Sequence, residues 1–99
     1  MDDIVLKLQR WYEAQCDGDW EHQYGISIES LDNPGWRVEI DLKNTPFAGV
    51  TFTRVEEKYQ NGGWLLCWVE GDKFAGAGDP SKLMVILQHF LEWTGSQAR

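Results

Sequence analysis

The chain has 99 residues, 42% hydrophobic and 25% charged, which is the balance of a single globular domain rather than of a disordered segment. Its 16 acidic residues against 9 lysines and arginines give a formal net charge of −7, and the basic residues occur singly. This charge argues against binding to nucleic acid, which normally requires a basic stripe, and against attraction to an anionic membrane surface.

Residues 3–16 are predicted to form an amphipathic helix. Apolar side chains recur there with the three- and four-residue spacing that lines one helical face. Asp2 or Asp3 would cap the first turn, and Gly18 would end the helix in a left-handed conformation. The residues of the apolar face are Ile4, Leu8, Trp11 and Tyr12.

Two alternating segments, residues 23–30 and 36–42, predict a β-hairpin. In each segment apolar side chains alternate with polar ones, which is the pattern of a strand with one buried face. The turn between them is Asp32-Asn33-Pro34-Gly35. Pro34 would preset the second turn position, and Gly35 would supply a positive φ at the third.

A second hairpin is predicted from residues 50–59 and 64–70. The turn Asn61-Gly62-Gly63 joins them, and Asn-Gly is the strongest short signal for a hairpin. Residues 64–70 are apolar on both faces. We therefore expect this strand inside the sheet or under a cover.

The C-terminal part predicts a glycine-rich connector at residues 73–78 and a helix over residues 80–94. Asp79 would cap this helix, and Pro80 suits its first position. With both helices, the chain predicts one α+β domain over residues 1–99. Its sheet would be a four-stranded antiparallel meander, with the N-terminal and C-terminal helices packed on one face.

Neither a membrane span nor an export signal is expected. The longest apolar run is residues 64–69, whereas a span needs about 20 apolar residues. The N-terminus is acidic and lacks the basic region of a signal peptide. We therefore expect a cytoplasmic protein in which Cys16 and Cys67 are free thiols.

No catalytic, cofactor-binding or metal-binding set is predicted. The carboxylates after Cys16 disfavour a thiolate, and Cys67 lies within an apolar strand. The acidic residues and His22 of the 17–22 segment match neither a calcium loop nor a zinc site. We predict that the protein is not an enzyme. A thiol-dependent sulfurtransferase and a small-ligand-binding module with a tryptophan-lined pocket remain the alternatives.

Six tryptophans are an unusual number for this length. Trp64 and Trp68 share one strand face, and Trp11 and Trp93 lie on the helical stripes, so all four are predicted to be core residues. Trp20 and Trp36 lie beside turns. They are either exposed or packed over the ends of the sheet.

An acidic segment containing Trp20 is the predicted partner-binding site. An exposed tryptophan rimmed by carboxylates resembles a protein-recognition hot spot. In the alternative, structural interpretation, Trp20 packs against Trp36 and Glu21 caps local backbone amides. The predicted partner-binding residues are Asp17, Asp19, Trp20, Glu21, Glu39 and Asp41.

Several segments resemble the immunity protein 53 family of bacterial polymorphic toxin systems. The most specific are Gly-Asp-Trp-Glu-His at 18–22 and Leu-Asp-Asn-Pro-Gly-Trp at 31–36. Phe74-x-Gly76-x-Gly78 and a last helix with Phe90 and Trp93 also fit. The resemblance implies a cytoplasmic antidote that binds and neutralises a cognate toxin. An acidic chain suits a basic enzyme such as a nuclease.

Overall fold

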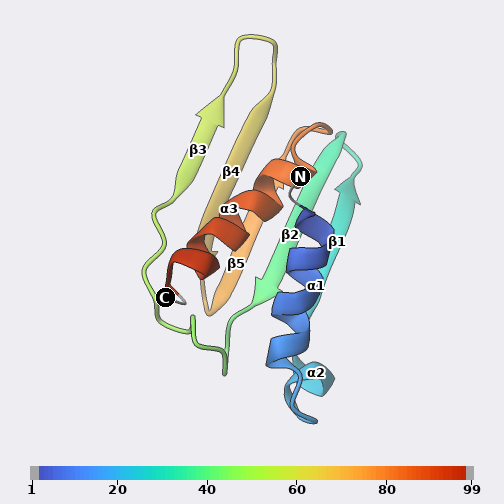
Figure 1. Cartoon of the computed structure of the whole chain (residues 1–99). Helices are drawn as coiled ribbons and strands as arrows, with labels where there is room; N and C mark the ends of the chain where they lie inside the picture. Colours follow the sequence, from blue (N-terminus) through green and yellow to red (C-terminus); the bar gives the residue numbers. More distant parts are fainter. Residues whose placement is uncertain (1–2, 98–99) are drawn as a thin grey trace.

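The structure is a computed structural model that describes residues 3–97 (Figure 1). One antiparallel sheet and N-terminal and C-terminal helices form an α+β fold, which confirms the predicted fold class. The helices are α1 (Ile4–Gln15), α2 (Trp20–Gln23) and α3 (Leu83–Gln97). The strands are β1 (Ile26–Leu31), β2 (Gly35–Asp41), β3 (Val55–Lys58), β4 (Trp64–Glu70) and β5 (Lys73–Gly78).

The sheet has five strands in the order β1-β2-β5-β4-β3, so the predicted four-stranded meander is wrong. The segment predicted as a connector, residues 73–78, is β5, and it pairs along its length with β2 on one side and β4 on the other. Its glycines and alanines have low intrinsic preference for strands. The two neighbouring strands satisfy its backbone, so tertiary pairing overrides that preference.

Small residues in β5 are required because α3 packs directly on its backbone. A Cβ atom on Gly76 would lie 2.3 Å from Cγ2 of Ile86, and one on Gly78 would lie 2.7 Å from Cβ of Lys82. Both distances are shorter than any ordinary van der Waals contact. The glycine pattern therefore lets α3 approach the middle of the sheet.

α1 and α3 lie against the same face of the sheet (Figure 1). The hydrophobic core fills the space between this face and the helices, and Phe74 of β5 and Phe90 of α3 meet there with ring centres 5.1 Å apart. No helix of the described chain covers the opposite face, which we call the uncovered face. The buried core residues are Leu8, Val38, Ile40, Leu42, Phe47, Leu65, Cys67, Phe74, Ile86, Leu87 and Phe90.

The first hairpin forms from β1 and β2, but β1 begins at Ile26 rather than at residue 23, because Gln23 belongs to α2. Gly35 also serves another purpose than the predicted one. The turn is Asp32–Pro34, and Gly35 is the first residue of β2 and does not have a positive φ. A Cβ atom there would lie 2.5 Å from the carbonyl oxygen of Gly78. Gly35 is therefore needed for the close approach of β2 and β5.

Two other predicted boundaries are wrong. Only residues 55–58 of the predicted 50–59 strand are paired, because Phe52 turns inward to pack on Phe74, with ring centres 5.4 Å apart. α3 begins at Leu83 rather than at residue 80. At the N-terminus, Asp3 caps α1 by accepting a 2.9 Å hydrogen bond from the Leu6 N–H, whereas Asp2 lies outside the described residues.

Asp79 ties the start of β4 to the turn before α3. Its Oδ2 accepts a 2.8 Å hydrogen bond from the Trp64 N–H. Its Oδ1 accepts hydrogen bonds from the Ser81 N–H at 2.8 Å and from the Ser81 hydroxyl at 2.6 Å. Hydrogen bonds from the Ser81 hydroxyl and then from its N–H hold the pKa of Asp79 well below its usual range.

Candidate functional site

The predicted acidic site lies where the loop after α1, the short helix α2 and the last residues of β2 come together (Figure 1). Gly18, with a φ of 99°, lets the chain reverse after α1. A backbone contact joins the two parts of the site, because the Asp41 N–H donates to the Gly25 carbonyl at 3.0 Å. We call this region, defined by residues 17–21, Glu39 and Asp41, the acidic end.

Trp20 anchors the acidic end from inside. Its side chain is only 3% exposed, so the structural interpretation holds for this residue, and we do not retain it as a direct partner contact. The indole Nε1–H donates to the Lys43 carbonyl at 2.9 Å. Its ring packs at centre distances of 5.9–6.2 Å against Trp11, Tyr12 and Tyr24, rather than against Trp36 as that interpretation supposed.

Asp17 and Glu21 bind the backbone of their own loop. The Glu21 carboxylate accepts the N–H groups of Asp17 at 3.0 Å and of Gly18 at 2.9 Å, which is the predicted capping of local amides. Asp17 Oδ1 accepts the N–H groups of Trp20 at 3.0 Å and of Asp19 at 2.9 Å. These bonds, chiefly the one from Trp20, lower the pKa of Asp17. Both carboxylates therefore fix the shape of the loop.

Asp19 differs from these neighbours. Its side chain is exposed and makes no hydrogen bond or ion pair with the described part of the chain. Its backbone is nevertheless held on both sides, through its own N–H to Asp17 and through its carbonyl, which accepts from the His22 N–H at 3.1 Å. Asp19 is thus a free charge on a fixed backbone.

Glu39 and Asp41 project on the uncovered face of β2, opposite the core residues Val38 and Ile40. Both have partners within the fold. Glu39 forms a 2.9 Å ion pair with Arg37, and Asp41 accepts from the Gly25 N–H at 2.9 Å and lies 3.8 Å from Lys73 Nζ. The structure therefore brings Asp41 to the loop, while Glu39 extends the acidic end along the sheet.

The uncovered face carries a stack of side chains that sequence reasoning missed. Trp68 of β4 lies between two guanidinium groups, with its ring centre 5.8 Å from Arg37 and 5.9 Å from Arg54. Arg37 reaches it across β5, whose Ala75 and Ala77 are only 5% and 7% exposed although no helix of the described chain covers them.

This stack corrects the assignment of Trp68 and Trp64 to the core. They share a face, as predicted, but it is the uncovered one, where both are half-buried. The available signal was the alternation of Trp64 and Trp68 with the core residues Leu65 and Cys67. This alternation places the two tryptophans on the face opposite the core once it is known which face of the sheet the helices cover. By contrast, Trp11 and Trp93 pack against the core as predicted.

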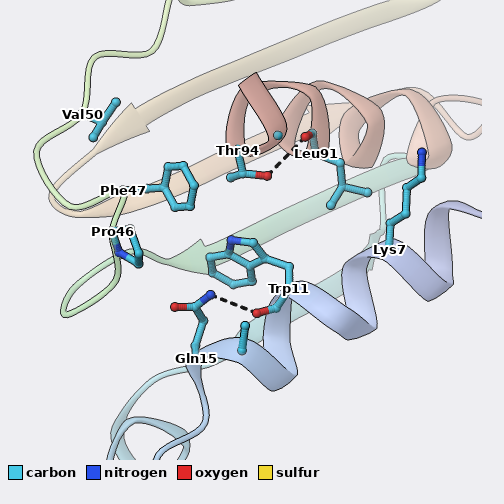
Figure 2. A pocket seen from close by; sticks show the side chains of 10 residues that line it. Lys7, Trp11, Gln15, Pro46, Phe47, Val50, Leu91 and Thr94 are labelled. Carbon is cyan, nitrogen blue, oxygen red and sulfur yellow. Dashed lines mark hydrogen bonds between the residues drawn. The ribbon is translucent and has the colours of Figure 1, made fainter. Parts of the chain in front are cut away.

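A groove of about 740 Å³ opens between α1, the loop around residues 46–50 and α3. Figure 2 shows Trp11 and Gln15 of α1 on one side of it and Phe47 and Leu91 on the other. The Trp11 Nε1–H is buried and has no hydrogen-bond partner in the described chain. The groove is thus mostly apolar, and one of the residues that line it, Trp11, has a buried N–H group without a partner in the described chain.

The two cysteines are free. Cys67 is fully buried in the core, and burial, reinforced by the charge of Glu57, raises the pKa of its thiol to about 12. A thiol with that pKa stays protonated at neutral pH and is a poor nucleophile. Cys16 is half-buried, and its thiol donates to the Tyr12 carbonyl at 3.4 Å.

Neither a metal-binding cluster nor a membrane-spanning helix is found among the described residues. Among residues 3–97, no three His, Cys, Asp or Glu side chains gather where they could hold a metal ion. Over the same residues, no helix has the length and apolar character needed to cross a membrane.

These features define a small acidic α+β protein with an ordered carboxylate-rich loop at one end of an open sheet. The family model for Immunity protein 53 matches residues 5–95, so the chain belongs to this family and is an immunity protein directed against a toxin. The resemblance inferred from its motifs is therefore confirmed. Searches of curated proteins and of solved structures found no significant match.

Proposed function

We propose that this immunity protein neutralises a basic toxin enzyme, such as a nuclease, by binding it through the acidic end in the cytoplasm. The observation that carries the proposal is Asp19, an exposed carboxylate whose loop is fixed by Trp20 and Glu21. A loop that is already ordered loses little conformational entropy when a partner binds. The feature that identifies the proposed partner is its positive charge.

The charge of the whole chain supports the same partner. A net charge of −7 accelerates association with a basic protein, because opposite fields steer the encounter. A nuclease binds phosphates in a basic cleft, and carboxylates can occupy that cleft in place of phosphates. A typical interface buries about 800 Å² on each partner. The acidic end lies next to the uncovered face of β2, and we propose that the two together form the surface that the toxin contacts.

Co-expression tests this function. The toxin domain encoded beside the gene of this chain is produced in bacterial cells with and without the chain, and growth is followed. We expect the chain to restore growth, and the purified chain to inhibit the purified toxin at a one-to-one ratio. A toxin whose effect is unchanged by an excess of folded chain would contradict the proposal.

Small-ligand binding is the second candidate, and the groove in Figure 2 favours it. Its volume of about 740 Å³ is within the usual range for ligand pockets, and the Trp11 indole N–H has no partner in the described chain. A fragment library screened by NMR tests this function. A fragment that shifts the Trp11 indole N–H signal, and loses binding in Leu91→Arg, would support it. No shift across the library would count against it.

The sulfurtransferase alternative finds no support in the geometry of Cys67, since its thiol is buried and its pKa is raised. Membership of an immunity-protein family likewise suggests binding rather than catalysis. We therefore propose a non-enzymatic inhibitor.

A further inference from the structure

β1 forms one edge of the sheet, and its outward backbone groups can be identified. β1 pairs with β2, and the Asp41 N–H bonds the Gly25 carbonyl at the start of this ladder. Hydrogen-bonded and non-hydrogen-bonded pairs alternate in an antiparallel ladder. The odd-numbered residues of β1 therefore bond β2, and the N–H and C=O groups of Ile26, Ile28 and Ser30 point away from the sheet.

An apolar hollow of about 410 Å³ adjoins this edge on the helix side, between α1 and the start of β1. Val5 of α1, which lines the hollow, is 69% exposed, and Ile28 of β1 is 41% exposed. α1 thus leaves part of the apolar side of β1 uncovered. A further strand paired with β1 would place every second side chain on this apolar surface. The hollow is lined by Val5, Leu8, Gln9, Tyr12, Gly25 and Ile26.

The other side of the same edge carries one exposed carboxylate, Glu29, which stands opposite Arg37 of β2. Glu29 is exposed on the uncovered face and accepts a 3.2 Å hydrogen bond from the Ser27 hydroxyl, but it forms no ion pair within residues 3–97. Ser27 stands opposite Glu39, and β1 begins next to the acidic loop. In a strand added here, the side chains that do not enter the hollow would therefore lie next to the negative charge of Glu29.

We propose that β1 binds an extended segment of the toxin as an additional strand, one in which apolar residues alternate with lysine or arginine. This inference rests on the proposed function and specifies how the partner docks. The outward backbone groups of β1 provide the hydrogen bonds, the hollow receives the apolar side chains, and Glu29 pairs with a basic one. A second copy of the chain fits less well, because it brings another net charge of −7 to the same edge.

Proline substitution separates edge pairing from the stability of the sheet. Ser30→Pro removes an outward N–H, and proline is tolerated on edge strands where that N–H faces solvent. Ser30→Ala keeps the N–H and is the matched control. The second pair is Val5→Asp, which places a charge beside the hollow, and Met84→Asp, which makes the same change at an exposed apolar residue of α3. Val5 and Met84 each occupy the second position of a helix.

Calorimetry with the toxin domain encoded beside the gene provides the measurement, with thermal melting to verify folding. We expect Ser30→Pro and Val5→Asp to weaken binding at least tenfold relative to Ser30→Ala and Met84→Asp. We also expect the amides of Ile28 and Ser30 to become protected from hydrogen exchange on binding. If Ser30→Pro does not fold, the Val5 and Met84 pair and the exchange data decide.

The outcomes separate the two proposals. Tight binding by the wild type that neither variant weakens, without protection of the two amides, would overturn strand addition and leave the proposed function standing. A wild type that does not bind the toxin would contradict the proposed function and the strand addition with it. A wild-type dimer that Ser30→Pro dissociates would show that a second copy occupies the edge, which also overturns the proposal.

Discussion

Trp11 and Trp20 pack against each other but contribute differently to the stability of the fold. Their rings meet edge to face at 6.2 Å. The Trp20 N–H is satisfied by the Lys43 carbonyl, whereas the Trp11 N–H is buried without a partner in the described chain. A buried donor without a partner costs about 1–3 kcal/mol of folding stability. Replacing Trp11 by phenylalanine removes this cost, which offsets part of the stability lost with the larger ring.

We therefore predict that Trp20→Phe destabilises the fold by about 2–3 kcal/mol, and that Trp11→Phe destabilises it by at least about 1 kcal/mol less. Only the first substitution breaks a hydrogen bond and leaves the Lys43 carbonyl without its donor. Urea denaturation of the two variants measures the difference. Equal losses, or a larger loss for Trp11→Phe, would contradict the assigned roles.

The lowered pKa of Asp79 predicts that this residue makes a contribution to stability that is lost in acid. Its pKa is lowered in the folded state by hydrogen bonds from Ser81, whereas an unfolded aspartate has a pKa of about 3.9. The unfolded chain therefore takes up the proton first. The contribution is fully present above the unfolded pKa and is lost as the pH falls below it toward the lower folded pKa.

Asp79→Asn is accordingly expected to flatten the dependence of unfolding free energy on pH between about pH 5 and 2, and to lower stability at pH 7. Asp19→Asn serves as control, because the Asp19 side chain is exposed and makes no hydrogen bond or ion pair within residues 3–97. Denaturation at a series of pH values gives both curves. An unchanged slope in Asp79→Asn would show that another carboxylate dominates.

At the scale of elements, β5 shows what the amino-acid pattern could and could not predict. The helices α1 and α3, the two predicted hairpins and the antiparallel sheet follow from local periodicity and turn residues, whereas α2 was not predicted. β5 does not follow from them either, because its Gly-Ala composition has the local signature of a loop. Its strand state depends on pairing with β2, which is distant in sequence, and on contacts with its sequence neighbours β4 and α3.

Gly76→Ala tests this packing. The new Cβ would lie 2.3 Å from Cγ2 of Ile86, so we expect a loss of about 2–3 kcal/mol. In an Ile86→Ala background the same change should cost about 1–2 kcal/mol less, because the obstructing methyl is gone. Gly25→Ala is the control, since a Cβ there meets no described atom within 4 Å. Additive losses in the double mutant would contradict direct helix-strand contact.

The residues of the candidate site are a prediction from the sequence, but most of the bonds within the site could not be predicted from it. A tryptophan among carboxylates has the same local pattern whether it contacts a partner or anchors a loop. The outcome depends on Trp11, Tyr24 and the Lys43 carbonyl, which local sequence does not place around Trp20. Capping of local amides by Glu21 was one of the two interpretations that the sequence allowed, whereas the backbone partners of Asp17 could not be predicted from it.

At the scale of the whole molecule, net charge and local charge have separate effects. The net charge of −7 raises the association rate with any basic protein, and its effect declines with salt. A specific contact depends on where a carboxylate lies. Asp19 and Glu92 are both exposed, but Asp19 lies in the acidic end and Glu92 lies on α3. Replacing either by lysine changes the net charge equally.

Calorimetric titration of the purified toxin domain with wild type, Asp19→Lys and Glu92→Lys, at low and at physiological salt, tests whether the toxin binds through the acidic end. We predict wild-type binding that weakens with salt, a loss of about tenfold or more in Asp19→Lys, and at most a small loss in Glu92→Lys. Thermal midpoints should remain close to wild type, as for exposed substitutions generally. Equal affinity of the two variants for the toxin would contradict binding through the acidic end.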